Sequence, residues 1–269
     1  MRLLSALSPA RSLKARLTLL TLSVFLSIAA GLALYVERLL HTSIERVLTA
    51  QQEDVTVTLA DLIDRQLKER QLALEQVALM GGLRSFNPME MQRLLDDLPV
   101  FQNLFSGGTF VTDARGIAVA SYPVSLPRLG VSFADRDYVS QVLTTGRPYI
   151  GRPVMGRITK APVVVMSSPI RDARGEVVGV VAGVLDLDQP GFLNAFRGKT
   201  FGETGSLLLV SARDRMVVTS SDRGRRLAPL PPPGNSPVLD SFLAGFEGST
   251  IFVDPRGIEV LASVKRLAS

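Results

Sequence analysis

An uncharged run near the N-terminus, residues 17–36, limits what this chain can fold into more than any other feature of the sequence. At about 1.5 Å per residue, a helix of this length spans the roughly 30 Å hydrocarbon core of a bilayer. The run is longer than the roughly 7–15 apolar residues of a signal peptide, and no clear small-x-small cleavage site precedes Glu37. The sequence therefore predicts an uncleaved membrane helix, with a cleaved signal peptide as the alternative.

Basic residues before this run hold most of the net charge. Arg2, Arg11, Lys14 and Arg16 precede it with no acidic residue, so they supply four of the formal +5. Positive charge on this side predicts a cytoplasmic N-terminus and a periplasmic location for everything after a single inner-membrane span. A nucleic-acid partner is not expected, because it would need a basic face on the folded domain.

A long helix is predicted directly after the span. No Pro or Gly occurs before Gly81, and apolar residues recur at steps of three to five across about residues 37–79. Gly81 and Gly82 are expected to end this helix, and a short helix over about residues 88–98 should follow with Asn87 as its cap. The narrow apolar stripe suits a helix that covers a sheet or one that forms a homodimer, and both alternatives stay open.

After residue 105 the pattern changes to short strands, and an internal repeat appears. Residues 110–121 (FVTDARGIAVAS) align without gaps to residues 209–220 (LVSARDRMVVTS), and each segment predicts a hairpin. Two more hairpins are predicted around residues 172–175 and 254–257, where Asp starts the turn and Gly supplies a positive φ. The expected fold class is α+β, with two lobes that each contain an antiparallel sheet and are joined near residues 191–202.

Residue types for catalysis and metal binding are scarce. The sequence has no cysteine and a single histidine, His41, so ordinary zinc sites and Ser-His-Asp triads are not available. No P-loop or GxGxxG pattern occurs. We therefore expect no metal, no cofactor and no enzymatic activity in this chain.

Three segments carry a family resemblance: residues 133–154 (FADRDYVSQVLTTGRPYIGRPV), 162–181 (PVVVMSSPIRDARGEVVGVV) and 202–210 (GETGSLLLV). The first two resemble the membrane-distal half of the double Cache extracytoplasmic sensors of bacterial membrane signalling proteins. The third is similar to the strand that opens the membrane-proximal lobe of that family. The resemblance implies two PAS-like (Cache) lobes beside a long helix that leads from the membrane.

With this resemblance, the chain is expected to contain five parts. They are a cytoplasmic N-terminus (1–16), a transmembrane helix (17–36), a long signalling helix (37–80), a membrane-distal Cache lobe (81–190) and a membrane-proximal Cache lobe (191–269). In the family a second span then enters a cytoplasmic output domain. Because this chain stops inside the expected last hairpin, we expect a fragment or a truncated product. The segments 230–237 and 252–263 resemble the sensors of diguanylate cyclases or hybrid histidine kinases.

The resemblance also implies small-ligand binding in the distal lobe, between its sheet and residues 122–150. Arg136 and Tyr138 lie in an Asp-Arg-Asp-Tyr motif, where a guanidinium can bind a carboxylate and a phenol can add a donor. Tyr149 and Arg152, on the next strand, would complete the pocket. The alternative is structural: the acidic and basic residues of this motif form a local salt bridge and cap a helix.

Amino-acid-sensing members carry an Arg-x-Trp-Tyr motif and a later Asp in the strand that corresponds to residues 181–187. This chain has no tryptophan, and Val184 stands where that Asp is expected. An α-amino group would lack its counter-charge, so the expected ligand is a small carboxylate before an amino acid. Three functions remain: a sensor that relays binding through the long helix, a membrane-anchored periplasmic binding or interaction domain without output, and, well behind, an extracytoplasmic enzyme.

Overall fold

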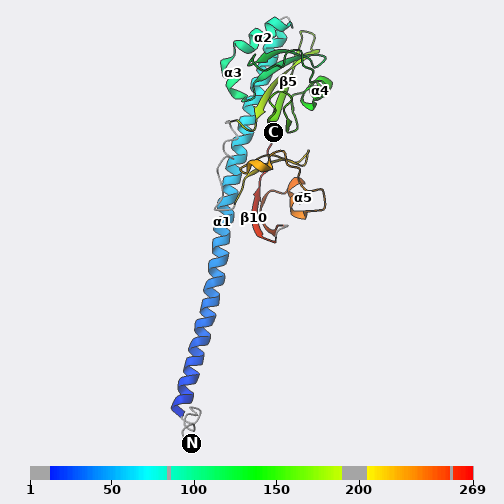
Figure 1. Cartoon of the computed structure of the whole chain (residues 1–269). Coiled ribbons are helices and arrows are strands. Elements are labelled where there is room, and N and C mark those ends of the chain that lie inside the picture. Colours follow the sequence, from blue (N-terminus) through cyan, green and yellow to red (C-terminus); the bar gives the residue numbers. More distant parts are fainter. Residues whose placement is uncertain (1–12, 84–85, 190–204, 255–256, 269) are drawn as a thin grey trace. The chain divides into compact units, whose positions relative to one another are not determined.

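The structure, a computed structural model, describes residues 13–83, 86–189, 205–254 and 257–268 (Figure 1). The chain divides into two compact units, residues 1–54 and 55–269. The linker predicted near residues 191–202 lies outside the described residues.

Helix α1 runs from Leu13 to Leu83 and contains the apolar run that the sequence singled out. The segment Leu17–Val36 has a mean hydropathy of 2.2, and its side chains are exposed rather than packed inside the protein. Among the described residues it is the one helical segment long and apolar enough to cross a membrane. Exposed apolar surface of this extent is consistent with a helix surrounded by lipid.

The glycine pair does not end α1, and this part of the prediction is wrong. The helix continues through Gly81 and Gly82 to Leu83, where it meets strand β5 (Pro162–Arg171). A Cβ atom added at Gly82 would lie 2.0 Å from the carbonyl oxygen of Arg171. Gly82 therefore permits a close approach of two backbones, which is the other common reason for a glycine inside a helix, whereas a Cβ at Gly81 would make only ordinary contacts with side chains.

Two short helices follow α1. Helix α2 (Pro88–Asp96) begins as predicted, because the Asn87 side chain accepts a hydrogen bond from the backbone N–H of Glu90 at 2.9 Å. Helix α3 (Pro99–Leu104) was not predicted, and its N-cap residue makes no side-chain cap bond.

The distal lobe is built on one six-stranded antiparallel sheet, drawn mainly in green in Figure 1. The strand order is β2-β1-β6-β5-β3, and β4 also pairs with β5. Both predicted hairpins are present, as β1 with β2 and as β5 with β6. The further strands are β1 (Thr109–Asp113), β2 (Ala118–Tyr122), β3 (Tyr149–Ile150), β4 (Val154–Met155) and β6 (Val177–Asp186).

Each face of this sheet packs against helices. Residues of alternate parity go to opposite faces, so Val181 joins the cluster that includes Leu74 of α1 and Leu94 of α2. Val180 joins the opposite cluster, which is covered by α4 (Asp137–Thr145) through Val139. We call the face that carries Val180 the second face, and its cluster the second-face cluster. The loop and helix after β2 cover this face, where the sequence predicted the ligand site.

The proximal lobe contains the other two predicted hairpins but not the single sheet that was expected. Strand β7 (Leu208–Ser211) pairs with β8 (Met216–Ser220), and β9 (Gly248–Val253) pairs with β10 (Glu259–Val264). In the part of the chain that the structure describes, these are two separate two-stranded sheets, with α5 (Pro237–Leu243) between them in the sequence. Turn residues specify each hairpin locally, whereas pairing between hairpins depends on distant neighbours.

Candidate ligand-binding site

The Asp-Arg-Asp-Tyr motif forms the start of α4. Arg136 is the N-cap residue, and its backbone N–H donates to the carbonyl oxygen of Phe133 at 2.9 Å. Asp135 pairs with Arg157 at 2.5 Å rather than with Arg136, and this contact holds the pKa of the Asp135 carboxyl below its usual value. The Asp137 carboxylate accepts the backbone N–H of Tyr138 at 2.9 Å. Both acids of the motif are thus engaged, and among the described residues neither forms a direct ion pair with the Arg136 guanidinium, although its charge also lowers the pKa of the Asp135 carboxyl.

Arg136 has a buried donor that is left without an acceptor in the part of the chain that the structure describes. Its Nε atom is buried and has no hydrogen-bond partner among the residues that the structure describes. A buried N–H of a charged group costs free energy unless an acceptor is present. An anionic ligand oxygen would supply that acceptor.

Tyr138 lies in the first turn of α4, is only 4% exposed, and packs in the second-face cluster. Its backbone N–H donates to Asp137, and its hydroxyl has no hydrogen-bond partner among the described residues. Burial raises the pKa of the Tyr138 phenol to about 12, although the nearby Arg136 and Arg157 oppose the shift. The hydroxyl is therefore protonated at neutral pH and can donate to a ligand oxygen.

Two aromatic rings stand beside these polar groups. Phe110 and Phe133 pack with ring centroids 4.7 Å apart. The guanidinium of Arg157 lies 5.7 Å from the Phe133 ring centroid, and that of Arg128 lies 5.4 Å from the Phe110 centroid. The pair thus has one arginine against each ring, within the range of cation–π attraction.

Arg128 is a buried cation that the sequence reasoning missed. It is 2% exposed and donates to the carbonyl oxygens of Gly107, Thr109 and Tyr122. Burial lowers the pKa of its guanidinium to about 10, and the nearby Tyr138 opposes the shift. No local signal could have identified it, because its partners come from strands and loops that only the fold brings together.

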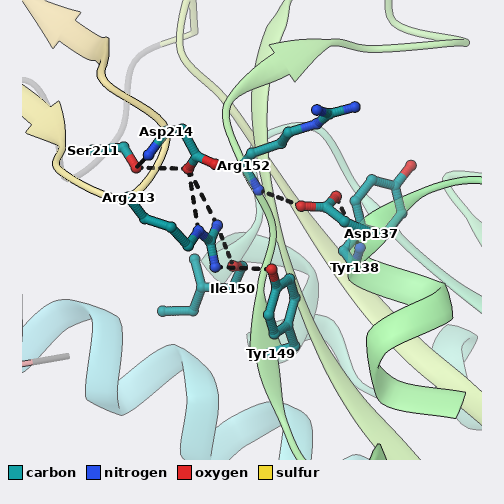
Figure 2. Close-up of polar contacts among 8 residues, drawn as sticks. All are labelled: Asp137, Tyr138, Tyr149, Ile150, Arg152, Ser211, Arg213 and Asp214. Carbon is teal, nitrogen blue, oxygen red and sulfur yellow. Dashed lines mark hydrogen bonds and ion pairs between the residues drawn. The ribbon is translucent and has the colours of Figure 1, made fainter. Parts of the chain in front are cut away.

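Tyr149 is engaged elsewhere. Its hydroxyl accepts a hydrogen bond from Arg213 at 2.8 Å, and the guanidinium lies 5.1 Å from the ring centroid (Figure 2). Arg213 belongs to the turn between β7 and β8 and was not foreseen from the sequence. The Tyr149 ring packs against the second-face cluster, but its hydroxyl is hydrogen-bonded to Arg213 of the proximal lobe.

Arg152 contributes its backbone rather than its guanidinium. The backbone N–H donates to Oδ2 of Asp137 at 2.8 Å, and the side chain is exposed. In Figure 2 this side chain extends away from Arg213 and Tyr149. Of the four predicted residues, Arg136 and Tyr138 lie together at the start of α4, whereas the polar groups of the other two side chains do not join them.

The arrangement favours an anion. Arg136 and Tyr138 offer donors, while the acids of the motif are already bonded. Val184 is 4% exposed within the apolar second-face cluster, so it brings no charge. Within the described ranges, no group of three or more His, Cys, Asp or Glu side chains is placed to hold a metal ion.

Comparison with known proteins agrees with this architecture. A family model described as "Cache domain" (dCache_1) matches residues 40–269. The chain belongs to the Cache domain family. The match confirms the double Cache resemblance of the distal and proximal segments, and no catalytic domain is evident in the matched residues of this Cache chain. Among curated proteins, no sequence relative is found.

Several solved structures with a similar fold are ligand-binding domains of chemoreceptors. The domain of Pseudomonas fluorescens CtaA with L-isoleucine has a TM-score of 0.65 at 19% identity, covering 85% of this chain and 90% of that one. The domain of Pseudomonas aeruginosa PctC with GABA has a TM-score of 0.59 at 20% identity, covering 76% and 87%. The domain of PctB from the same species with L-Arg has a TM-score of 0.57 at 22% identity, covering 68% and 74%. These likenesses confirm the predicted α+β Cache fold.

Proposed function

We propose that this chain is the extracytoplasmic sensing region of a transmembrane signal-transduction protein and that it binds a small carboxylate in its distal lobe. Residues 1–16 would be cytoplasmic, and binding would be relayed through α1 to an output domain such as a diguanylate cyclase or a histidine kinase. The Cache fold and the apolar segment Leu17–Val36 support this proposal. Homodimerisation through α1 stays a prediction.

One observation carries the ligand assignment. The buried, unpartnered Nε of Arg136 adjoins the turn of α4 that presents the unbonded hydroxyl of Tyr138. A carboxylate bound at the start of α4 would accept from Arg136, and Tyr138 would supply a second donor; charge-assisted hydrogen bonds of this kind are the stronger ones. Arg136 and Tyr138 are therefore the proposed ligand contacts. Ligand contact by the Tyr149 ring and the Arg152 side chain stays a prediction.

The engaged acids favour carboxylates over amino acids. An α-ammonium group needs a carboxylate partner when it is buried. Asp135 is paired with Arg157, and Asp137 accepts two backbone N–H groups. L-isoleucine, GABA and L-Arg occupy structural neighbours of this chain, but here both acids of the motif already have partners within the protein, which makes them less suited to receive an ammonium.

Titration of the full chain in detergent micelles tests this proposal. Acetate, L-lactate, pyruvate and succinate are compared by calorimetry with L-isoleucine, GABA and L-arginine. We expect at least one organic acid to bind more tightly than every amino acid. Arg136→Ala should weaken that binding by about tenfold or more, because a hydrogen bond to a charged group contributes about 1.5–3 kcal/mol.

The matched control is Arg147→Ala, which removes an exposed arginine of the same lobe. It should leave the affinity unchanged. An Arg136→Ala chain that binds as tightly as the parent would overturn the site, and tighter binding of an amino acid would overturn the ligand class.

A further inference from the structure

Residues 149–152 connect the two lobes of the described structure. On one side, Arg213 donates to the hydroxyl of Tyr149 at 2.8 Å and to the carbonyl oxygen of Ile150 at 3.5 Å. The same guanidinium lies over the Tyr149 ring. Arg213 therefore holds the side chain of one residue and the backbone of the next (Figure 2).

On the other side, the same segment is bonded to the start of α4. The backbone N–H of Arg152 donates to Oδ2 of Asp137 at 2.8 Å. The second carboxylate oxygen of Asp137 accepts the backbone N–H of Tyr138 at 2.9 Å. One carboxylate thus ties the segment to the turn that presents Arg136 and Tyr138.

Gly151, in the middle of the segment, contacts both strand β5 and the first turn of α4. Its N–H donates to the carbonyl oxygen of Val165 on β5 at 2.8 Å. A Cβ atom at this position would lie 2.9 Å from Cβ of Tyr138 and 3.3 Å from Oδ1 of Asp137. Glycine therefore lets the segment lie directly against the first turn of α4, and a side chain here would push the two apart.

The orientation of Arg213 is set within its own turn. Its Nε and Nη2 atoms donate to Oδ2 of Asp214 at 3.3 and 3.2 Å. The same oxygen accepts the hydroxyl of Ser211 at 2.6 Å. Because the planar guanidinium of Arg213 is bonded to its own turn and also stacked on the Tyr149 ring, it fixes the position of that ring relative to the turn.

We propose that residues 149–152 form a strut through which Arg213 positions Arg136 and Tyr138 for the ligand. Arg213 is then a positioning residue of the distal site, although it belongs to the proximal lobe. Because coupling between two sites is reciprocal, anything that moves the start of α4 also changes the contact at Arg213. The part of this inference that concerns ligand affinity rests on the proposed function, whereas the mechanical link does not.

The mechanical link is tested without a ligand. The chain has no cysteine, so Ala212→Cys gives a single attachment point for a nitroxide in the turn beside Arg213. The full chain is studied in detergent micelles by electron paramagnetic resonance. Asp137→Ala, which cuts the strut from α4, should increase the mobility of the label. Gly151→Ala should do the same, and it preserves the Asp137 carboxylate if the first variant folds poorly.

Asp172→Ala is the matched control. The Asp172 carboxylate accepts two backbone N–H groups, from Arg174 at 2.9 Å and from Glu176 at 3.0 Å, but in a different turn of the same lobe. This variant should leave the label unchanged. If Asp137→Ala and Gly151→Ala also leave it unchanged while circular dichroism shows a folded chain, the strut is overturned.

The effect on the site is tested with the organic acid among acetate, L-lactate, pyruvate and succinate that the parent chain binds most tightly. Arg213→Ala should weaken binding by about fivefold. Tyr149→Phe should weaken it less, because phenylalanine keeps the ring contact and the bond to Ile150 remains. The double variant should bind as weakly as Arg213→Ala, because the hydroxyl bond lost in Tyr149→Phe is already absent there. Arg215→Ala is the control, since that arginine bonds Asp240 and Pro231 inside the proximal lobe. Its affinity should match that of the parent.

The two arms separate two kinds of failure. If none of the acids binds the parent chain, the proposed function fails, and the label at position 212 alone decides the strut. If an acid binds and Arg213→Ala is indistinguishable from Arg215→Ala, the positioning role is overturned while the proposed function stands.

Discussion

The repeated hairpin adopts the same local structure in both lobes but has very different surroundings. Strand β1 lies between β2 and β6, and its first four residues are buried. Strand β7 pairs with β8 in a two-stranded sheet, and each of its residues is half-buried. Local sequence therefore specifies the hairpin, while burial depends on whether a second hairpin adds its strands beside it.

The consequence is a difference in what stabilises each lobe. The distal lobe has apolar clusters on both faces of its sheet. The proximal lobe relies more on polar contacts, such as Arg215 with Asp240 at 2.9 Å and Lys265 with Glu247 at 2.6 Å. Exposed ion pairs contribute little individually, so we expect the proximal lobe to open more readily.

Two arginines give the largest expected contrast between the lobes. Arg128→Ala removes a buried guanidinium and leaves the carbonyl oxygens that it served without a donor, so the free energy of unfolding should fall by about 2–4 kcal/mol. Arg215→Ala breaks a partly exposed pair and should cost about 0.5–1 kcal/mol. Urea unfolding of the full chain measures both. Equal losses would contradict the contrast.

The repeat also provides two equivalent valines, one in each lobe, whose substitution should change the free energy of unfolding by a smaller amount. Val111 and Val210 occupy equivalent positions in the aligned segments, but Val111 is fully buried and Val210 is half-buried. Val111→Ala should reduce the free energy of unfolding by about 2–3 kcal/mol through lost burial and the cavity left behind, and Val210→Ala by about 1 kcal/mol. Hydrogen exchange of peptides from each hairpin shows where each loss is felt. A larger effect at Val210 would mean that the proximal lobe has a tighter core than its exposure indicates.

Acid should produce the smallest effect. Carboxyls with a lowered pKa occur in both lobes, but we expect the effect mainly in the proximal lobe, because the distal lobe is also held by its apolar clusters. The backbone N–H of Gly234, with Arg215, holds the pKa of the Asp240 carboxyl below its usual value, and Lys265 does the same for Glu247. A lowered folded-state pKa stabilises the fold above the unfolded value and is lost as the pH falls through the folded value.

Hydrogen exchange corrected for its intrinsic rate should therefore show the proximal lobe loosening before the distal lobe as the pH falls from about 5 to about 3, through and below the usual carboxyl values. The two carboxyls are partly exposed, and added salt should reduce the effect. Loosening of the distal lobe first would show that its own pairs, such as Asp135 with Arg157, matter more than its apolar clusters.

The fold was largely predictable because most of its signals are local. The helical form of the apolar segment, the Asn87 cap and the four hairpins each depend on residues close in the sequence, and each is present in the structure. The end of α1 was not predicted correctly, because Gly82 is required by the close approach of a strand some ninety residues away rather than by the end of the helix. Contacts between distant segments are also why the proximal lobe was predicted incorrectly: the sequence predicts each hairpin, but not whether two hairpins pair into one sheet.

In the candidate site, too, the residues that lie close in the sequence were placed correctly, and those that depend on distant contacts were not. Arg136 and Tyr138 are two residues apart, so the start of one helix brings them together. Tyr149 was assigned to the same pocket by proximity in the sequence, yet its hydroxyl binds Arg213 of the other lobe. Arg128 shows no pattern in the sequence, because its acceptors are backbone carbonyls that carry no residue signature.

The contact between Gly82 and Arg171 has a consequence for movement. Because no side chain separates the helix backbone from the β5 carbonyl there, turning α1 about its own axis would bring a bulkier residue to that oxygen and force the two elements apart. Sliding the helix would do the same. The last turn of α1 and strand β5 therefore have one permitted alignment, and we expect any displacement of the sheet to carry that end of the helix along with it.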